Sequence, residues 1–127
     1  MERQLVTIQK VEKLNNIFAL DNKGPGNANH RYLIENIDFD GENDDTRKVQ
    51  LEIQFQEGPR KDPNSISGVI DSDLLEIVKD RLEGFQSGDF ATNDNAKALE
   101  HVELALMYLN KRVMDRYERN VLGTNEK

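Results

Sequence analysis

The sequence lacks cysteine, has only two histidines and contains no long apolar run, and each shortage excludes a class of protein. Without cysteine the chain forms no disulfide and offers no thiolate to a metal, as suits a reducing compartment. His30 and His101 are too few and too scattered for a zinc site without further ligands, so we expect no metal and no cofactor. No segment approaches the roughly 20 apolar residues of a membrane-spanning helix.

Apolar side chains are also scarce. They make up 36% of the 127 residues against 32% charged residues, which predicts one polar, globular domain over residues 1–127. Oligomerisation would be a natural way to bury more surface. The N-terminal residues lack the apolar segment of a signal peptide, so we expect a cytoplasmic protein. With a net charge of −7, the chain is a poor binder of DNA or RNA, and an anionic ligand must meet a local basic cluster.

The first 70 residues have the short β-prone runs and the alternation of strands. We predict strands at residues 5–8 and 17–20, and a hairpin over residues 31–56 with its turn at residues 40–45. Apolar and polar residues alternate strictly from Val49 to Gln56, which is typical of an antiparallel strand with one solvent-exposed face.

Residues 71–120 have helical spacing and predict an antiparallel two-helix hairpin. Asp71 or Ser72 is the expected cap of the first helix, and Thr92 or Asn93 opens a second helix of roughly 25 residues. A heptad-like stripe runs along the second helix: Asn95, Leu99, Val102, Leu106, Leu109, Val113 and Arg116. The predicted fold class is therefore α+β, with a sheet over residues 1–70 followed by the hairpin.

A basic cluster lies near the end of the second predicted helix. Arg112, Arg116 and Arg119 are spaced i, i+4, i+7 and share one helix face, and guanidinium groups bind phosphate oxygens bidentately. The alternative is a solvated helix end, where cations are favoured and neighbouring carboxylates pair with them. On spacing alone the alternative is the stronger interpretation.

Other candidates also have two interpretations. Phe85 is either a surface for stacking a nucleobase or the last core residue of its helix. Asn95 either binds a base or ribose or caps its helix, and Arg60 is otherwise an ordinary surface residue. The Gly24–His30 loop lacks the setting of a phosphate-binding loop and is better explained as a turn. No serine or threonine has a histidine as general base in an evident motif, so we expect that the protein is not an enzyme and has no catalytic residue.

Helix length bears on these candidates. Arg112 and Arg116 follow Asn95 by 17 and 21 residues, or about 25–30 Å along a helix. A small nucleotide cannot contact both Asn95 and these arginines in one chain. If the residues share one site, the cations come from another chain, as in an antiparallel two-fold dimer.

A combination of short motifs covers about the last 45 residues. The motifs are Phe85–Gly88, Thr92–Asn95, Ala105–Arg112, Asp115–Arg116 and Val121–Thr124. Together they resemble the phage Thoeris anti-defence sponges and the related anti-CBASS cyclic-nucleotide sponges. The N-terminal half resembles the sheet portion of the Thoeris-directed branch.

The resemblance implies a non-catalytic protein of the host cytoplasm. It would bind glycocyclic ADP-ribose-type signals without cleaving them, as a homodimer or, in some members, a hexamer. Phe85 would stack on the adenine, Arg60 would cover its other face and Asn95 would bind the base or ribose. Arg112 and Arg116 of the partner chain would hold the diphosphate. Three alternatives stay open: a sponge for cyclic di- or trinucleotides, an enzyme that degrades the signal, and a module whose helical seam binds a partner protein.

Overall fold

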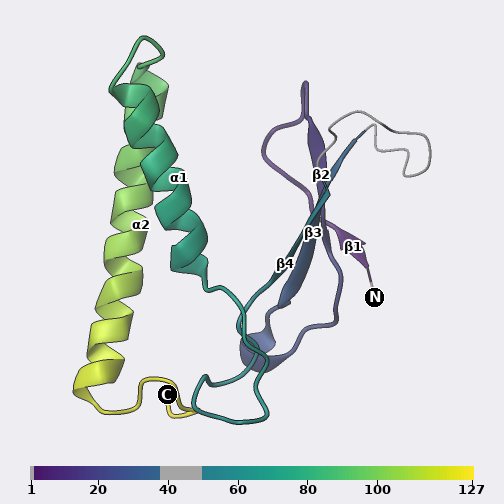
Figure 1. The fold of residues 1–127 in the computed structure, drawn as a ribbon, viewed down its shortest axis with the longest axis vertical. Helices are drawn as coiled ribbons and strands as arrows, with labels where there is room; N and C mark the ends of the chain where they lie inside the picture. The colour runs from purple at the N-terminus through teal and green to yellow at the C-terminus, as the bar shows by residue number, and fades with distance from the viewer. Residues whose placement is uncertain (1, 38–49) are drawn as a thin grey trace. The chain divides into compact units, whose positions relative to one another are not determined.

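The structure is a computed structural model that describes residues 2–37 and 50–127. A four-stranded sheet is followed by two helices, which confirms the predicted α+β class (Figure 1). The chain divides into two compact units, Met1–Gly58 with Asn64–Gly68 and Pro59–Pro63 with Val69–Lys127. A single domain over the whole chain stays a prediction. None of the described helices is long and apolar enough to cross a membrane.

The sheet is an antiparallel meander in which neighbours in sequence are neighbours in space. Its strands are β1 (Arg3–Gln4), β2 (Asn15–Ala19), β3 (Arg31–Asn36) and β4 (Gln50–Gln54). The pairing of β3 with β4, in which Ile34 lies opposite Leu51, confirms the predicted hairpin. Its predicted turn at residues 40–45 lies outside the described residues.

The predicted strand at residues 5–8 is wrong. β1 ends at Gln4, and after a last bond from the Leu5 N–H to the Ile17 carbonyl (2.8 Å) the chain leaves the sheet. Val6 and Ile8 are then 91% and 101% exposed. The hydroxyl of Thr7 donates to the Gln9 carbonyl at 3.0 Å. Such local hydrogen bonds from side chains compete with strand pairing for the backbone carbonyls.

The core of the sheet unit is small. Ala19 is the only fully buried apolar side chain among the described residues, and Leu51 on the expected apolar face of β4 is 51% exposed. Tyr32 and Phe55 contact each other edge to face, with ring centroids 5.6 Å apart. The sheet is therefore held together by the pairing of short strands and by few buried side-chain contacts.

The first helix, α1, spans Asp71–Gln86, and its cap differs from the prediction. The capping position is Ile70, not Asp71 or Ser72. The carboxylate of Asp73 accepts the Ile70 N–H at 2.9 Å. An acidic side chain at the third helical position therefore stabilises the helix start, as it does in a capping box.

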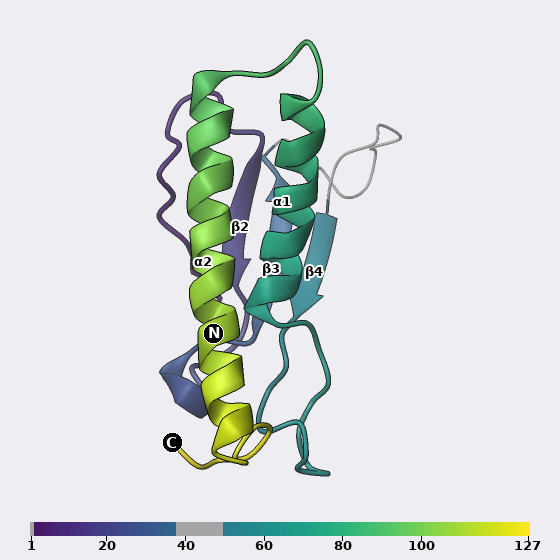
Figure 2. The same ribbon diagram turned by 90° about the vertical axis from the view of Figure 1, so that its left-hand side faces the viewer.

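The second helix, α2, spans Asn93–Glu118 and begins as predicted at Thr92, whose hydroxyl accepts the Asn95 N–H at 3.0 Å. The predicted seam is confirmed: every α2 residue that is not exposed belongs to it, and Val113 at its edge is 37% exposed. The two helices lie side by side and antiparallel (Figure 2). The seam is therefore the face of α2 that is least exposed to solvent.

Candidate functional site

Phe85 and Asn95 lie together at the turn of the hairpin, which we call the aromatic end. Phe85 is in the last turn of α1 and remains 41% exposed, so part of its ring is open to a ligand. The side-chain amide of Asn95 has no hydrogen-bond partner among the described residues, while its backbone N–H caps the helix on Thr92. The connection is held by the Gln86 amide oxygen, which accepts the Thr92 N–H at 3.0 Å.

Arg81 is a residue of the aromatic end that the sequence analysis missed. Its guanidinium carbon lies 5.5 Å from the centroid of the Phe85 ring, within cation–π range. The i, i+4 spacing of Arg81 and Phe85 on one helix is the sequence signal that points to it.

Arg116 lies at the opposite end of α2 and is only 8% exposed. Its Nη2 atom donates to the carbonyls of Val121 and Thr124 at 3.1 and 3.2 Å, so it holds the turn after the helix. These bonds occupy one nitrogen of the three in the guanidinium group. Arg116 is therefore not the solvated side chain of the alternative interpretation.

The other two helical arginines differ from Arg116. Arg112 is exposed and has no hydrogen-bond or ion-pair partner among the described residues. Arg119 pairs with Asp115 at 3.1 Å, as the alternative interpretation expects for this cluster. Of these three, Arg112 is the one whose guanidinium group is best placed to bind a ligand.

Arg60 also lies at this end of the helical unit. A Cβ atom placed on Gly123 would lie 3.1 Å from Arg60 Cγ and 3.2 Å from its Nε, and the Lys61 N–H donates to the Gly123 carbonyl at 3.2 Å. Gly123 belongs to the turn that Arg116 holds. We call Arg60, Lys61, Arg112 and Arg116 the cationic end. The sequence analysis missed Lys61, because no local pattern links it to a turn 62 residues further along the chain.

The aromatic and cationic ends are separated by the length of α2, which is one continuous helix of 26 residues. The 17 residues from Asn95 to Arg112 correspond to about 25 Å. One chain therefore gathers the five predicted residues into two groups, Phe85 with Asn95 and Arg60 with Arg112 and Arg116. It does not bring the two groups together.

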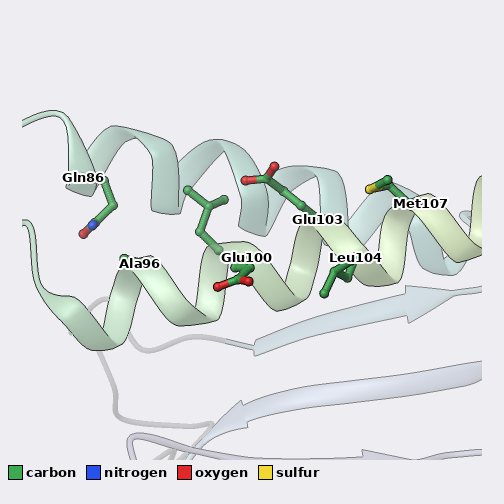
Figure 3. Close-up of a pocket in the computed structure, with 7 residues that line it drawn as sticks. Gln86, Ala96, Glu100, Glu103, Leu104 and Met107 are labelled. Atoms are coloured by element: carbon green, nitrogen blue, oxygen red, sulfur yellow. The ribbon is translucent and has the colours of Figure 1, made fainter.

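A shallow groove of ≈ 370 Å³ runs between α1 and α2 and includes none of the five predicted residues. Gln86 comes from α1, and the other labelled residues come from α2 (Figure 3). Glu100 and Glu103 line the groove. Two carboxylates repel a diphosphate, so this groove does not suit an anionic ligand.

The fold defines a helical-hairpin domain that follows a small antiparallel sheet. The Acb2/Tad1 hairpin domain family matches residues 47–114, and the chain belongs to this family. The match spans β4 and most of the hairpin, and includes Arg60, Phe85, Asn95 and Arg112. Arg116 lies two residues beyond it.

A relative with a related name is "Thoeris anti-defense 1" of Bacillus phage SBSphiJ7. The two sequences are 43% identical over 75 residues, which are 59% of this chain and 52% of the relative. The matched region thus spans about half the length of that relative. The resemblance found from the short motifs is confirmed at the level of the family.

Proposed function

We propose that this protein is a phage anti-defence protein that binds a cyclic ADP-ribose-type signalling nucleotide in the host cytoplasm and holds it intact. The observation that carries the proposal is the family match over residues 47–114, which contains residues of both the aromatic and the cationic end. The name of the phage relative, which refers to Thoeris defence, supports this class of target.

The proposed site is built from two chains. Phe85 of one chain stacks on the adenine and its Asn95 amide binds the base or ribose. Arg112 and Arg116 of the partner chain bind the diphosphate, and Arg60 covers the free face of the base. Because Arg60 lies at the cationic end, it enters the site with the partner's arginines. Stacking contributes about 1–3 kcal/mol per base, and charge-assisted hydrogen bonds to the diphosphate add to it.

A homodimer supplies this arrangement if two hairpins pair antiparallel about a two-fold axis. Each aromatic end then lies beside the partner's cationic end, which gives two equal sites. The hairpin has surface available for pairing, since no apolar side chain of α1 or α2 is fully buried. The most exposed large apolar side chains of α2 are Leu104, Met107, Tyr108, Met114 and Tyr117.

The hydroxyl groups of the aromatic end support the proposal that the protein binds the nucleotide without cleaving it. The Ser87 hydroxyl donates to the Gly84 carbonyl at 2.7 Å, and the Thr92 hydroxyl accepts the Asn95 N–H. Both hydroxyls thus have structural bonds, and among the described residues neither forms a hydrogen bond with a basic side chain that would activate it. A degrading enzyme is the competing function. Heating the complex and analysing the released ligand by mass spectrometry separates the two, because a sponge returns the original nucleotide.

The binding test uses Phe85→Ala and Arg112→Ala with cyclic ADP-ribose isomers in a calorimeter. We expect each variant to stay folded and to lose at least about tenfold in affinity, as about 1.4 kcal/mol requires. Unchanged affinity in both variants would overturn the site. Cyclic di- and trinucleotides in the same panel test the related alternative, and native mass spectrometry reads the number of subunits.

Mixing the two variants tests the sharing of the site between chains. After exchange of subunits, a mixed dimer has one site with both changes and one site with neither. We therefore expect binding to recover at one of the two sites of each mixed dimer, which is about a quarter of all sites after random exchange of equal amounts. No recovery, in a mixture shown to contain mixed dimers, would mean that one chain holds the whole site.

A further inference from the structure

Three segments of the sheet unit meet at one end of the sheet: the exits of β2 and β4 and the entry of β3. Asp21 follows β2, His30 directly precedes β3 and Glu57 follows β4. Backbone bonds fix the segments, because the Leu20 N–H donates to the Arg31 carbonyl at 2.9 Å and the Phe55 N–H donates to the His30 carbonyl at 2.7 Å. Glu57 is fixed by two bonds with Ile66, both of 2.9 Å.

The side chains of Asp21, His30 and Glu57 converge as metal ligands do. Each offers one nitrogen or oxygen atom, and these three atoms lie within 4.8 Å of one another. Ligand atoms around a tetrahedral zinc ion lie about 3.3 Å apart, given bonds of about 2.0 Å. Small side-chain rotations therefore suffice to close the three groups on one ion.

The burial of His30 is an independent sign that a ligand belongs here. The residue is only 8% exposed, and its Nδ1 atom is buried without a hydrogen-bond partner among the described residues. Buried polar atoms of proteins almost always have a partner. A bound metal ion would give this imidazole one.

The Asp21 carboxylate is already oriented by the loop. It accepts hydrogen bonds from the backbone N–H groups of His30 at 3.0 Å and Arg31 at 3.3 Å, and from the Asn29 amide at 3.3 Å. Burial acts to raise the pKa of Asp21, but these hydrogen bonds outweigh it and leave the pKa below its usual value. Hydrogen bonds of this kind orient metal ligands.

We propose that Asp21, His30 and Glu57 bind one divalent transition-metal ion, with zinc as the best fit and water as a fourth ligand. One imidazole and two carboxylates suit zinc, whereas calcium and magnesium take oxygen ligands alone. The ion fastens the Leu20–Arg31 loop to the segment after β4. The site belongs to the sheet unit, whereas the residues proposed to bind nucleotide belong to the helical unit.

The test uses the full chain without a histidine tag, freed of metal by a chelator. Titration with Zn²⁺ alone in a calorimeter is expected to show one ion per chain, and zinc is expected to raise the Tm where magnesium does not. Glu57→Gln keeps the side-chain size and should weaken zinc binding at least about tenfold. The metal-free Tm should stay unchanged, because the Glu57 side chain has no bond among the described residues to lose.

His101→Gln is the matched control, because His101 is exposed on α2 and is the other histidine of the chain. This variant is expected to bind zinc as the unchanged protein does. NMR of the two imidazoles provides a readout that needs no variant: zinc should shift the ring nitrogen signals of His30 and leave those of His101 in place.

The proposal is overturned if zinc leaves the Tm unchanged, if Glu57→Gln binds zinc as tightly as the unchanged protein, or if His101 responds in place of His30. None of these outcomes bears on the proposed nucleotide site, which is tested by Phe85 and Arg112.

Discussion

At the scale of single residues, Arg112 and Arg116 look equivalent in the sequence but differ in their surroundings. They are one helical turn apart, yet Arg116 is buried and bonded to two carbonyls while Arg112 is exposed. Arg116 holds the fold of the C-terminal turn in addition to its proposed role in binding phosphate, whereas the exposed guanidinium group of Arg112 has only the proposed role. The effect of substituting each arginine on the free energy of unfolding distinguishes their roles.

We expect Arg116→Ala to lower the free energy of unfolding by about 1–3 kcal/mol, because two carbonyls lose a charged donor. Arg112→Ala is expected to change it by less than about 0.5 kcal/mol, as for surface positions in general. Urea denaturation followed by circular dichroism measures both. Equal stabilities would show that the bonds of Arg116 do not hold the turn.

The start of each helix allows a second test at this scale. Thr92→Ala removes the hydroxyl that accepts the Asn95 N–H and should cost about 1 kcal/mol of stability. Ser72→Ala is the control, since the sequence pattern favours Ser72 as a cap whereas the structure places Ile70 there. We expect this control to lie within about 0.5 kcal/mol of the unchanged protein in the same urea titration.

At the scale of elements, Gly68 marks a place where two segments of the sheet unit run very close together. A Cβ atom at Gly68 would collide with the Gln54 carbonyl oxygen and lie 2.5 Å from the carbonyl carbon of Phe55. These are backbone atoms at the end of β4, which cannot rotate away as a side chain does. We expect Gly68→Ala to lower the Tm and to cost about 1–3 kcal/mol, as overpacking does.

Gly84 is the matched opposite case. It lies inside α1, and a Cβ atom there would meet nothing within 4 Å. Gly84→Ala should therefore raise the stability by about 0.5–1 kcal/mol, since alanine favours a helix over glycine. Thermal unfolding of both variants measures the contrast. A fall in the Tm of Gly84→Ala would show that this position tolerates no side chain.

At the scale of the whole molecule, the shortage of buried apolar surface favours self-association. The helices have no fully buried apolar side chain, and Tyr108 in the middle of α2 is 71% exposed. Tyr108→Asp is expected to yield a monomer in light scattering after gel filtration, because a charge on each copy resists burial in a paired face. Nucleotide binding should be lost with the dimer.

Val6→Asp serves as the control, because Val6 is 91% exposed and belongs to the sheet unit, not to the helical unit. It should remain a dimer that binds nucleotide. If Tyr108→Asp is a monomer that still binds with full affinity, then the site does not need two chains.

The sequence by itself determined the features that depend on neighbours along the chain. Alternation along β4, the seam of α2 and the cap at Thr92 are local patterns, because side-chain period and capping chemistry act within a few residues. The same locality explains the error at residues 5–8. β propensity is a local property, but it does not decide whether the chain stays beside β2 after Leu5.

Only the tertiary structure decided what distant segments do together. It placed Arg60 against Gly123, buried Arg116 under the C-terminal turn and brought Asp21 and Glu57 to His30. The sequence analysis expected no metal because the two histidines are scattered and have no further ligands nearby in the sequence. Partners separated by tens of residues meet through the pairing of strands and the packing of helices, which no local period encodes.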